Sequence, residues 1–188
     1  MNLSWSHKLF LKINASIGKN RARDRFMSFS AYWLLFVFVF SIVAYGLYQW
    51  SQGNSSWLIQ YLELFATAFI FAEAFSYSFA FFFRHPRPII EFPSIIQLRV
   101  PLETWKSFPS DHAIASFSLA SVLLFVPETA WWFITFSYLC AVVISIARVY
   151  IGVHYPRDII GGMIVASVVV WLSPFLFSHI IEPITRLW

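Results

Sequence analysis

The chain has 188 residues, of which 59% are apolar, 21% aromatic and only 12% charged, and its formal net charge is +4. A soluble domain averages about 45–50% apolar and about 25% charged residues, and a polar surface could not cover all the apolar side chains found here. Intrinsic disorder is excluded as well, because it requires low hydrophobicity and high charge. The single cysteine, Cys140, excludes an intrachain disulfide and a zinc site built from cysteines. The composition therefore predicts a membrane protein.

The N-terminal segment, residues 1–25, is too short and too charged to span a bilayer. Within residues 2–17, Lys8 and Lys12 interrupt the apolar side chains, and the segment lacks the continuous apolar core and the cleavage site of a signal peptide. We expect an amphipathic helix that lies in the membrane interface, followed by the basic run 19–23. The alternative is a frayed tail.

Five apolar runs follow, and a bilayer core of about 30 Å needs about 20 helical residues to cross it. They cover residues 26–50, 57–83, 111–126, 130–150 and 156–181, of which the third is short. Because lipid does not tolerate unpaired backbone groups, these runs are expected to be helices. The sequence thus predicts an all-α integral membrane protein, a bundle of about five transmembrane helices plus the interfacial helix. We expect residues 1–188 to form one domain.

The crossings place nearly all basic residues on one side of the membrane. We call this side the charged face; it receives residues 1–25, the segment 84–110 and the connection 151–155. The opposite face receives only the short, nearly uncharged turns 51–56 and 127–129 and the C-terminus, where Arg186 is the exception. One face is therefore the expected place for polar chemistry.

Three polar clusters converge on the charged face, at residues 84–88, 108–112 and 148–158. Their arginines offer planar, permanently charged donors that suit phosphate oxygens. Ser110 is a favourable N-cap, so that a helix should begin just after it. The free amide groups and the positive dipole end of that helix would form an anion site.

Two histidines complete this set of groups. His112 lies in the first turn of the third run, within reach of an anion held there. His154 and Asp158 are four residues apart, with Pro156 well placed as a first helical residue. Asp158 can reach back like the acid of a capping box and hold one imidazole nitrogen of His154, which leaves the other nitrogen free to attack an electrophile. These groups together predict phosphoryl transfer.

The three clusters resemble the tripartite signature of the type 2 phosphatidic acid phosphatase superfamily, K-x-x-x-x-x-x-R-P, P-S-G-H and S-R-x-x-x-x-x-H-x-x-x-D. Here the signature reads Ala80 to Arg87-Pro88, then Pro109-Ser110-Asp111-His112, then Ala147-Arg148 to His154 and Asp158. Order, spacing and placement at the ends of the spans all agree. Residues 108–113, F-P-S-D-H-A, are similar to several relatives that act on undecaprenyl diphosphate.

The resemblance implies a double displacement that needs no metal and no cofactor. His154 would attack phosphorus and form a phosphohistidine, with Asp158 orienting it, while His112 would protonate the departing oxygen and later activate water. The phosphate and its transition-state charge would be held by Arg87, Arg148, Ser110 and the amide of Asp111. The segment 84–110 would be an active-site loop.

Three positions depart from the signature. Ala80 stands where the family has its lysine, and we expect Arg84, one helical turn further on and on the same face, to replace it in phosphate binding. Asp111 replaces a glycine, and its carboxylate would repel phosphate unless it is turned away or paired. Ala147 replaces a serine, with the loss of one minor hydrogen bond.

Other polar residues on the charged face allow two interpretations. Headgroup anchoring and a place in the site both suit three basic residues, Arg99, Lys106 and Arg157. We expect His85 to be a loop residue, and His7 and His179 to lie at the interface. Gly161 and Gly162 would permit close helix packing.

Glu73 lies about ten residues inside the second run, where a lone carboxylate costs several kcal/mol. Its spacing from Arg84 corresponds to about 16 Å along a helix, too far for a direct part in phosphate chemistry. It is either a protonated acid bonded to a neighbouring helix or part of the polar lining of a lipid-entry groove.

The leading hypothesis is a membrane-embedded lipid phosphatase or diphosphatase, with undecaprenyl diphosphate converted to undecaprenyl phosphate as the best single candidate. Phosphatidate and phosphatidylglycerol phosphate are the alternative substrates. A proton-coupled transporter using Glu73 would need ionisable residues along several spans, and only the second carries them. A catalytically inactive lipid-binding scaffold would explain Ala80 and Asp111 but not the intact His112, His154 and Asp158.

The expected partners are a lipid phosphate or diphosphate and the bilayer itself, with no nucleic acid, and the sequence does not fix the oligomeric state. The positive-inside rule puts the charged face in the cytoplasm. Relatives that recycle the lipid carrier work at the outer face. By this resemblance we expect a bacterial inner (plasma) membrane protein with its active site on the outer face.

Overall fold

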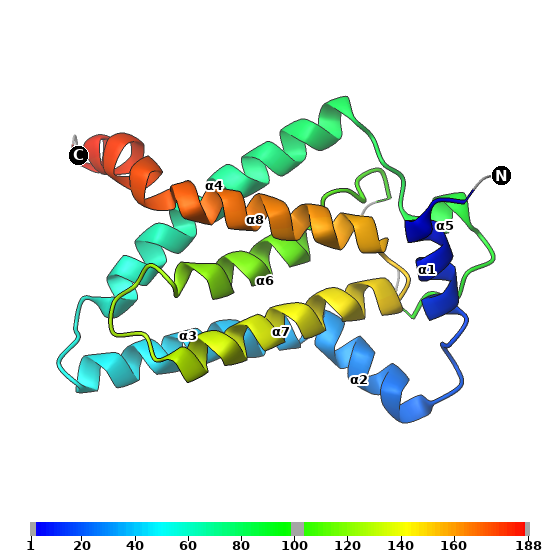
Figure 1. Ribbon diagram of the computed structural model, residues 1–188, viewed down its shortest axis with the longest axis horizontal. Coiled ribbons are helices and arrows are strands. Elements are labelled where there is room, and N and C mark those ends of the chain that lie inside the picture. Colours follow the sequence, from blue (N-terminus) through cyan, green and yellow to red (C-terminus); the bar gives the residue numbers. More distant parts are fainter. Residues whose placement is uncertain (1–2, 99–103, 187–188) are drawn as a thin grey trace.

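The computed structural model describes residues 3–98 and 104–186, and all their regular elements are helical apart from one isolated bridge between His85 and Lys106. In chain order (Figure 1) the elements are α1 (Trp5–Asn14), α2 (Arg21–Tyr32), α3 (Leu34–Ser51), α4 (Trp57–Phe82), α5 (Pro88–Glu91), α6 (Asp111–Val122), α7 (Trp131–Tyr150), α8 (Pro156–Leu176), the π-helical turn η1 (Phe177–Ile181) and α9 (Glu182–Thr185). Within these described ranges, four helical segments are long and apolar enough to cross a membrane: Leu34–Ser51, Trp57–Phe82, Trp131–Tyr150 and Pro156–Ile184. The prediction of an all-α integral membrane protein is confirmed.

The short third run forms α6, which lies in the middle of the bundle (Figure 1) and packs against α4, α7 and α8. Its 12 residues rise only about 18 Å, less than the thickness of a bilayer core. The predicted helix over 111–126 is too long, because the chain turns after Val122. The surrounding helices shield α6 from lipid, so that three buried serines, Ser116, Ser118 and Ser121, are tolerated within it.

The first apolar run is not one helix. The predicted span 26–50 is wrong at its start, because α2 ends at Tyr32 and α3 begins at Leu34 after a break at Trp33. The polar start of α2 is tied to the end of α7: Arg23 Nε donates to the Tyr150 hydroxyl at 2.9 Å, and this hydroxyl donates to Asp24 Oδ1 at 2.5 Å. These bonds hold α2 against α7 at the charged face, so that α3 alone crosses the membrane in this part of the chain.

The predicted N-terminal helix is present as α1. The Ser4 side chain accepts a hydrogen bond from the amide of His7 at its start, and Phe10 is fully buried. Asn14 exchanges two hydrogen bonds with the backbone of Ile96, at 2.7 and 3.1 Å. One side of α1 is therefore packed on α7, α8 and the loop after α5, while Trp5 on another side is exposed.

Two glycines bring the start of α6 against the first turns of α8, as predicted for Gly161 and Gly162. A Cβ atom on Gly162 would lie 2.8 Å from the Ser110 carbonyl oxygen, and one on Gly161 would lie 2.3 Å from the Phe108 ring. A larger residue at position 162 would force the two helices apart, because the atom it meets belongs to the backbone of Ser110. This close approach sets the distance between the second and third polar clusters.

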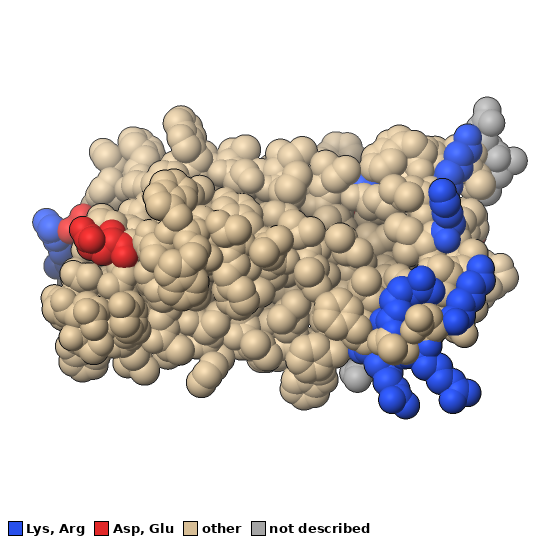
Figure 2. Space-filling model, turned by 60° about the horizontal axis from the view of Figure 1, so that its bottom comes forward, with Lys and Arg blue, Asp and Glu red and all other residues tan. Residues whose placement is uncertain are grey.

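Charge is distributed as the crossing pattern predicts. Figure 2 shows Lys and Arg side chains gathered at one end of the molecule, with a smaller basic group beside acidic side chains at the other end. Arg186, on the opposite face, pairs with Glu182 at 2.6 Å. The charged face is thus the end that carries α1, the start of α2, and the loops around α5.

Candidate active site

Backbone hydrogen bonds join the three polar clusters at the charged face. Arg87 N donates to Thr104 O at 3.2 Å and Ser107 N to His85 O at 2.8 Å, so that the loop after α4 runs beside the loop before α6. Ser110 N donates to Asp158 O at 3.1 Å and joins the start of α6 to the start of α8. Segments far apart in the sequence therefore form one site.

His154 lies at the centre of this site and is only 2% exposed. Its Nδ1 is 3.0 Å from the carbonyl oxygen of Ser107. Because a carbonyl can only accept, Nδ1 carries the proton, and Nε2 presents its lone pair to the Arg87 guanidinium, whose Nη1 is 3.0 Å away. Burial lowers the pKa of His154 from 6.5 to about 4, and the charges of Arg87 and Arg148 act in the same direction against Asp158. At neutral pH the imidazole is therefore uncharged, with Nε2 facing a cation.

Asp158 is fully buried, and its carboxylate belongs to the predicted capping box of α8. Its Oδ2 accepts from the Tyr155 amide at 2.8 Å and from the Ser107 hydroxyl at 2.6 Å. The expected contact with the imidazole is present but longer than a hydrogen bond, with Oδ2 3.6 Å from His154 Nδ1. Ser107 instead connects the two residues, with its hydroxyl on Asp158 and its carbonyl on His154.

Ser107 is the residue that the sequence analysis missed. It lies just outside the second cluster, and its contribution depends on where its backbone carbonyl points, which no side-chain pattern reveals. Its position next to the 108–112 cluster was the only signal available.

Two buried arginines flank the imidazole, each 5% exposed. Arg87 Nη1 also donates to Val153 O at 3.1 Å. Arg148 Nη1 donates to Ala31 O at 3.3 Å, and its guanidinium lies over the Tyr32 ring, 5.5 Å from the centroid. The Nε of Arg148 is buried and has no hydrogen-bond partner in the described part of the chain. The site therefore holds fixed positive charge with a donor still available.

The start of α6 brings three more of the predicted residues to the site. Ser110 occupies the N-cap position, but its hydroxyl makes no capping bond and is buried without a partner among residues 3–98 and 104–186. His112, in the first turn, interacts electrostatically with Arg148, His154 and Arg87. The Asp111 carboxylate is paired with Lys106 and accepts from the Ser76 hydroxyl at 3.5 Å.

Arg84 does not continue the helical face of Ala80, contrary to the prediction, because α4 ends at Phe82. Arg84 lies beyond the helix and is exposed, without a hydrogen bond or ion pair to any described residue, whereas Ala80 is fully buried. The buried amine near the second cluster is that of Lys106, which is 1% exposed. Lys106 is therefore not a headgroup anchor.

The remaining predicted residues lie around the site. Arg157 Nε is 3.6 Å from Asp158 Oδ1 and its guanidinium covers the Tyr155 ring, and Arg99 lies outside the described residues. His85 lies in the loop after α4, as expected, with Nδ1 2.9 Å from Phe83 O. His7 is more than an interfacial residue, because its Nε2 lies 3.1 Å from Glu91 Oε2.

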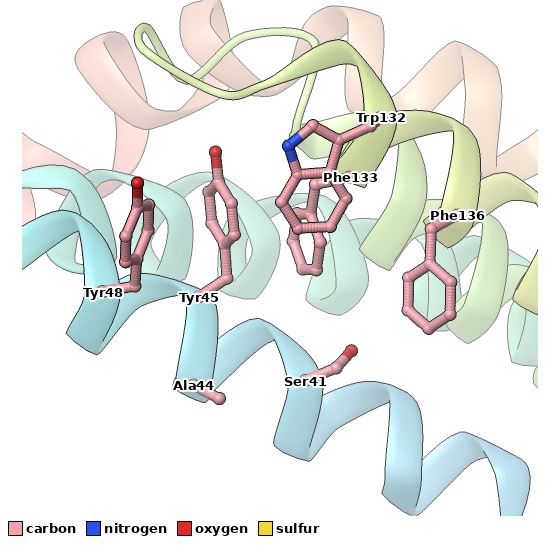
Figure 3. A pocket seen from close by; sticks show the side chains of 7 residues that line it. All are labelled: Ser41, Ala44, Tyr45, Tyr48, Trp132, Phe133 and Phe136. Atoms are coloured by element: carbon pink, nitrogen blue, oxygen red, sulfur yellow. The ribbon is translucent and has the colours of Figure 1, made fainter.

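An apolar groove of about 430 Å³ lies between α3 and α7, far along both helices from the polar clusters. Figure 3 shows that aromatic side chains from both helices line it, and the lining consists of Ser41, Ala44, Tyr45, Tyr48, Trp132, Phe133 and Phe136. None of the residues of the three clusters is among them, so the groove is separate from the site.

Known proteins are similar to this chain in sequence. The family model described as the PAP2 superfamily matches residues 57–180. The undecaprenyl-diphosphatase BcrC of Bacillus subtilis is 25% identical over 185 residues, which cover 97% of this chain and 89% of the relative. A lipid A 4'-phosphatase of Bacteroides thetaiotaomicron is 41% identical over 69 residues, 37% of this chain and 30% of the relative.

Solved structures match in fold. The crystal structure of Aquifex aeolicus LpxE superposes with a TM-score of 0.70 at 23% identity, covering 92% of this chain and 96% of that one. A PAP2 type phosphatidylglycerolphosphate phosphatase from Bacillus subtilis gives a TM-score of 0.55 at 19% identity, covering 93% and 95%.

Proposed function

Because the chain belongs to the PAP2 superfamily of membrane lipid phosphatases, we propose that it hydrolyses undecaprenyl diphosphate to undecaprenyl phosphate and inorganic phosphate. The observation that carries the proposal is the position of His154. Its unprotonated Nε2 faces Arg87 in a buried, positively charged site at the end of the bundle.

In the first step, Nε2 of His154 attacks the terminal phosphorus. The bond between this phosphorus and the bridging oxygen breaks, and its electron pair leaves with undecaprenyl phosphate. The product on the enzyme is a phosphohistidine. Because Ser107 O holds the opposite side of the ring, the imidazole keeps its orientation throughout the attack.

In the second step, water attacks the phosphohistidine. His112, protonated when the negatively charged substrate occupies the site, donates this proton to the departing oxygen in the first step and then, unprotonated, accepts a proton from the attacking water. The bond between phosphorus and Nε2 breaks, inorganic phosphate leaves, and His154 returns to its starting state. Asp158 stabilises the positive imidazole through Ser107 and from 3.6 Å.

Phosphate oxygens are held by donors that the protein leaves available. Arg148 Nε and the Ser110 hydroxyl are buried without partners in the described chain, and leaving such a donor unpaired costs about 1–3 kcal/mol. The amide groups at the start of α6, including that of Asp111, add the positive end of the helix dipole. Arg87 adds positive charge beside His154, and a phosphate would satisfy the donors of Arg148 and Ser110 at once.

Two lines of support favour a lipid diphosphate. The relative named undecaprenyl-diphosphatase BcrC aligns with 97% of this chain, and residues 108–113 have the F-P-S-D-H-A form. We further propose that residues 1–188 form one phosphatase domain in the plasma membrane of a bacterium, with the charged face outside. Labelling of a cysteine at position 20, in the Cys140→Ala background, by an impermeant thiol reagent on intact cells tests this orientation; protection from the reagent would place the charged face inside.

The experiment that tests the function measures phosphate release in detergent, with a chelator and without added metal. The substrates are undecaprenyl diphosphate, phosphatidate and phosphatidylglycerol phosphate. We expect undecaprenyl diphosphate to have the highest kcat/KM and His154→Ala and His112→Ala to abolish release, with His179→Ala on the exposed C-terminal turn as a matched control. A higher kcat/KM for phosphatidate or phosphatidylglycerol phosphate would make that lipid the substrate instead. No release from any lipid would favour a transporter or an inactive lipid-binding scaffold.

A further inference from the structure

A buried charged cluster lies on the side of α6 that faces α4. Lys106 is 1% exposed, and its ammonium group pairs with the Asp111 carboxylate, lies 3.5 Å from Pro109 O and sits over the ring of Tyr77, 4.3 Å from its centroid. Glu73, one turn of α4 from Tyr77, interacts electrostatically with both Asp111 and Lys106. The cluster therefore contains two carboxyl groups and one amine.

Asp111 is placed where a free carboxylate would interfere with phosphate binding. It is the first residue of α6, whose amide groups form the anion site, and it interacts electrostatically with Arg148. An unpaired Asp111 carboxylate would repel the substrate phosphate and compete with it for Arg148. Phosphate binding therefore requires a group that holds the negative charge of Asp111 away from the site.

Lys106 is the group in position to do so. Its three ammonium donors are directed to Asp111, to Pro109 O and to the face of Tyr77. An ammonium group with these three partners has no donor left for a phosphate oxygen. Lys106 therefore acts on the site through Asp111.

We propose that Lys106 is a positioning residue that neutralises Asp111 and holds its carboxylate towards α4, so that Arg148 and the start of α6 remain available to the substrate phosphate. The proposal rests on the proposed function only in that this site binds phosphate. It explains how the site accommodates an aspartate at the first residue of α6, and it assigns a role to a lysine that the sequence left between two interpretations.

The test compares Lys106→Met with the double variant Lys106→Met/Asp111→Asn, and Lys8→Met, an exposed lysine on the same face, is the matched control. The probes are inorganic phosphate, as a competitive inhibitor, and whichever lipid phosphate the wild type hydrolyses. Lys106→Met leaves the Asp111 charge unpaired, and we expect its KM and its phosphate inhibition constant to rise about 10- to 100-fold, with a smaller change in kcat. In the double variant both constants return to within about threefold of the wild type, because the charge is gone and the amide of residue 111 remains.

Recovery in the double variant separates this role from a purely structural one. If the double variant is as defective as Lys106→Met, or if Lys106→Met matches the wild type, the proposal is overturned. Should Lys106→Met fail to fold, the double variant alone decides: wild-type phosphate inhibition supports the proposal, and inhibition weakened about tenfold contradicts it. If the wild type hydrolyses no lipid phosphate, the proposed function fails, while thermal stabilisation by inorganic phosphate still compares the same variants.

Discussion

The two ends of the bundle are built from different chemistry. At the charged face, the buried charged or basic side chains, each at most 5% exposed, are those of Arg87, Lys106, Arg148, His154 and Asp158. At the opposite face, neutral groups make the connections, since the Tyr45 hydroxyl accepts from Ala130 N at 2.8 Å and Trp57 Nε1 donates to Thr129 Oγ1 at 3.0 Å. Neutral hydrogen bonds are enough to hold helices together, so the buried charges at the charged face need another explanation.

The charged face carries the free-energy cost of burying charged side chains, and the opposite face does not. Removing a charge from water costs several kcal/mol unless it is paired. At the charged face the protein buries two arginines next to a neutral histidine and leaves donors on Arg148 and Ser110 without partners among the residues that the structure describes. A phosphate is the kind of ligand that would offset these costs.

The largest effect on catalysis is expected when one of the two buried arginines at the charged face is replaced. In Arg87→Lys an ammonium group cannot replace the two contacts that Nη1 makes, with Val153 O and His154 Nε2. We expect kcat/KM to fall about 100- to 1,000-fold, and the exposed Arg21→Lys on the same face to leave it unchanged. Steady-state kinetics on the lipid substrate measure both. A fall of less than about threefold in Arg87→Lys would mean that buried charge is not what the site requires.

A second prediction concerns pH. The folded-state pKa of His154 is about 4, below the unfolded value of 6.5, so the folded protein binds fewer protons. Stability from this group is complete above pH 6.5 and is lost as pH falls towards 4, by up to about 3 kcal/mol.

Unfolding in detergent between pH 7 and 4 measures this loss. His154→Gln should lose less stability over the same range than the wild type, and His179→Gln, exposed near the C-terminus, should follow the wild type. Identical pH profiles for wild type and His154→Gln would contradict the buried, neutral state of this imidazole.

Ser107→Ala separates the contribution of the Ser107 hydroxyl at the charged face from that of its backbone carbonyl. It removes the 2.6 Å hydrogen bond to Asp158 but keeps the backbone carbonyl that holds His154. We expect kcat to fall about tenfold, as for the loss of one hydrogen bond to a charged group, with KM little changed. A loss of kcat as large as that of His154→Ala would show that the hydroxyl, rather than the carbonyl, sets the orientation of the imidazole.

The smallest effect is expected at the opposite face. Tyr45→Phe leaves the amide of Ala130 without its acceptor and should lower the free energy of unfolding by about 1 kcal/mol. Phosphate release should not change, and Tyr48→Phe, exposed on the same helix, should change neither quantity. Impaired catalysis in folded Tyr45→Phe would link the two ends of the molecule.

The sequence predicted those features that depend on local patterns. The apolar runs located α4, α7 and α8, and Ser110 and Pro156 marked the starts of α6 and α8 within a residue. Two failures concern where a helix ends, after Val122 and after Phe82, and the others involve contacts between distant segments. The break at Trp33 follows from the bonds of Arg23 and Asp24 with Tyr150 at the end of α7.

The predictions for the site also succeeded where local patterns decide and failed where contacts beyond those patterns decide. The spacing of His154 and Asp158 predicted the capping box, but the role of Ser107 depends on a backbone carbonyl. Arg84 was placed by extending a helix past its last residue, Phe82, and Lys106 was undecided because its partners lie on α4 and α6. The spacing of residues along the sequence does not reveal such contacts.

The central claim is that Nε2 of His154 attacks phosphorus, and the most direct measurement is to trap the intermediate. Enzyme mixed with undecaprenyl diphosphate labelled in the terminal phosphate, and quenched in base within milliseconds, should carry label on His154 at Nε2, because Nδ1 is held by Ser107. The label should be acid-labile and absent from His154→Ala. Label on another residue, or labelling of His154→Ala at the wild-type level, would contradict the account.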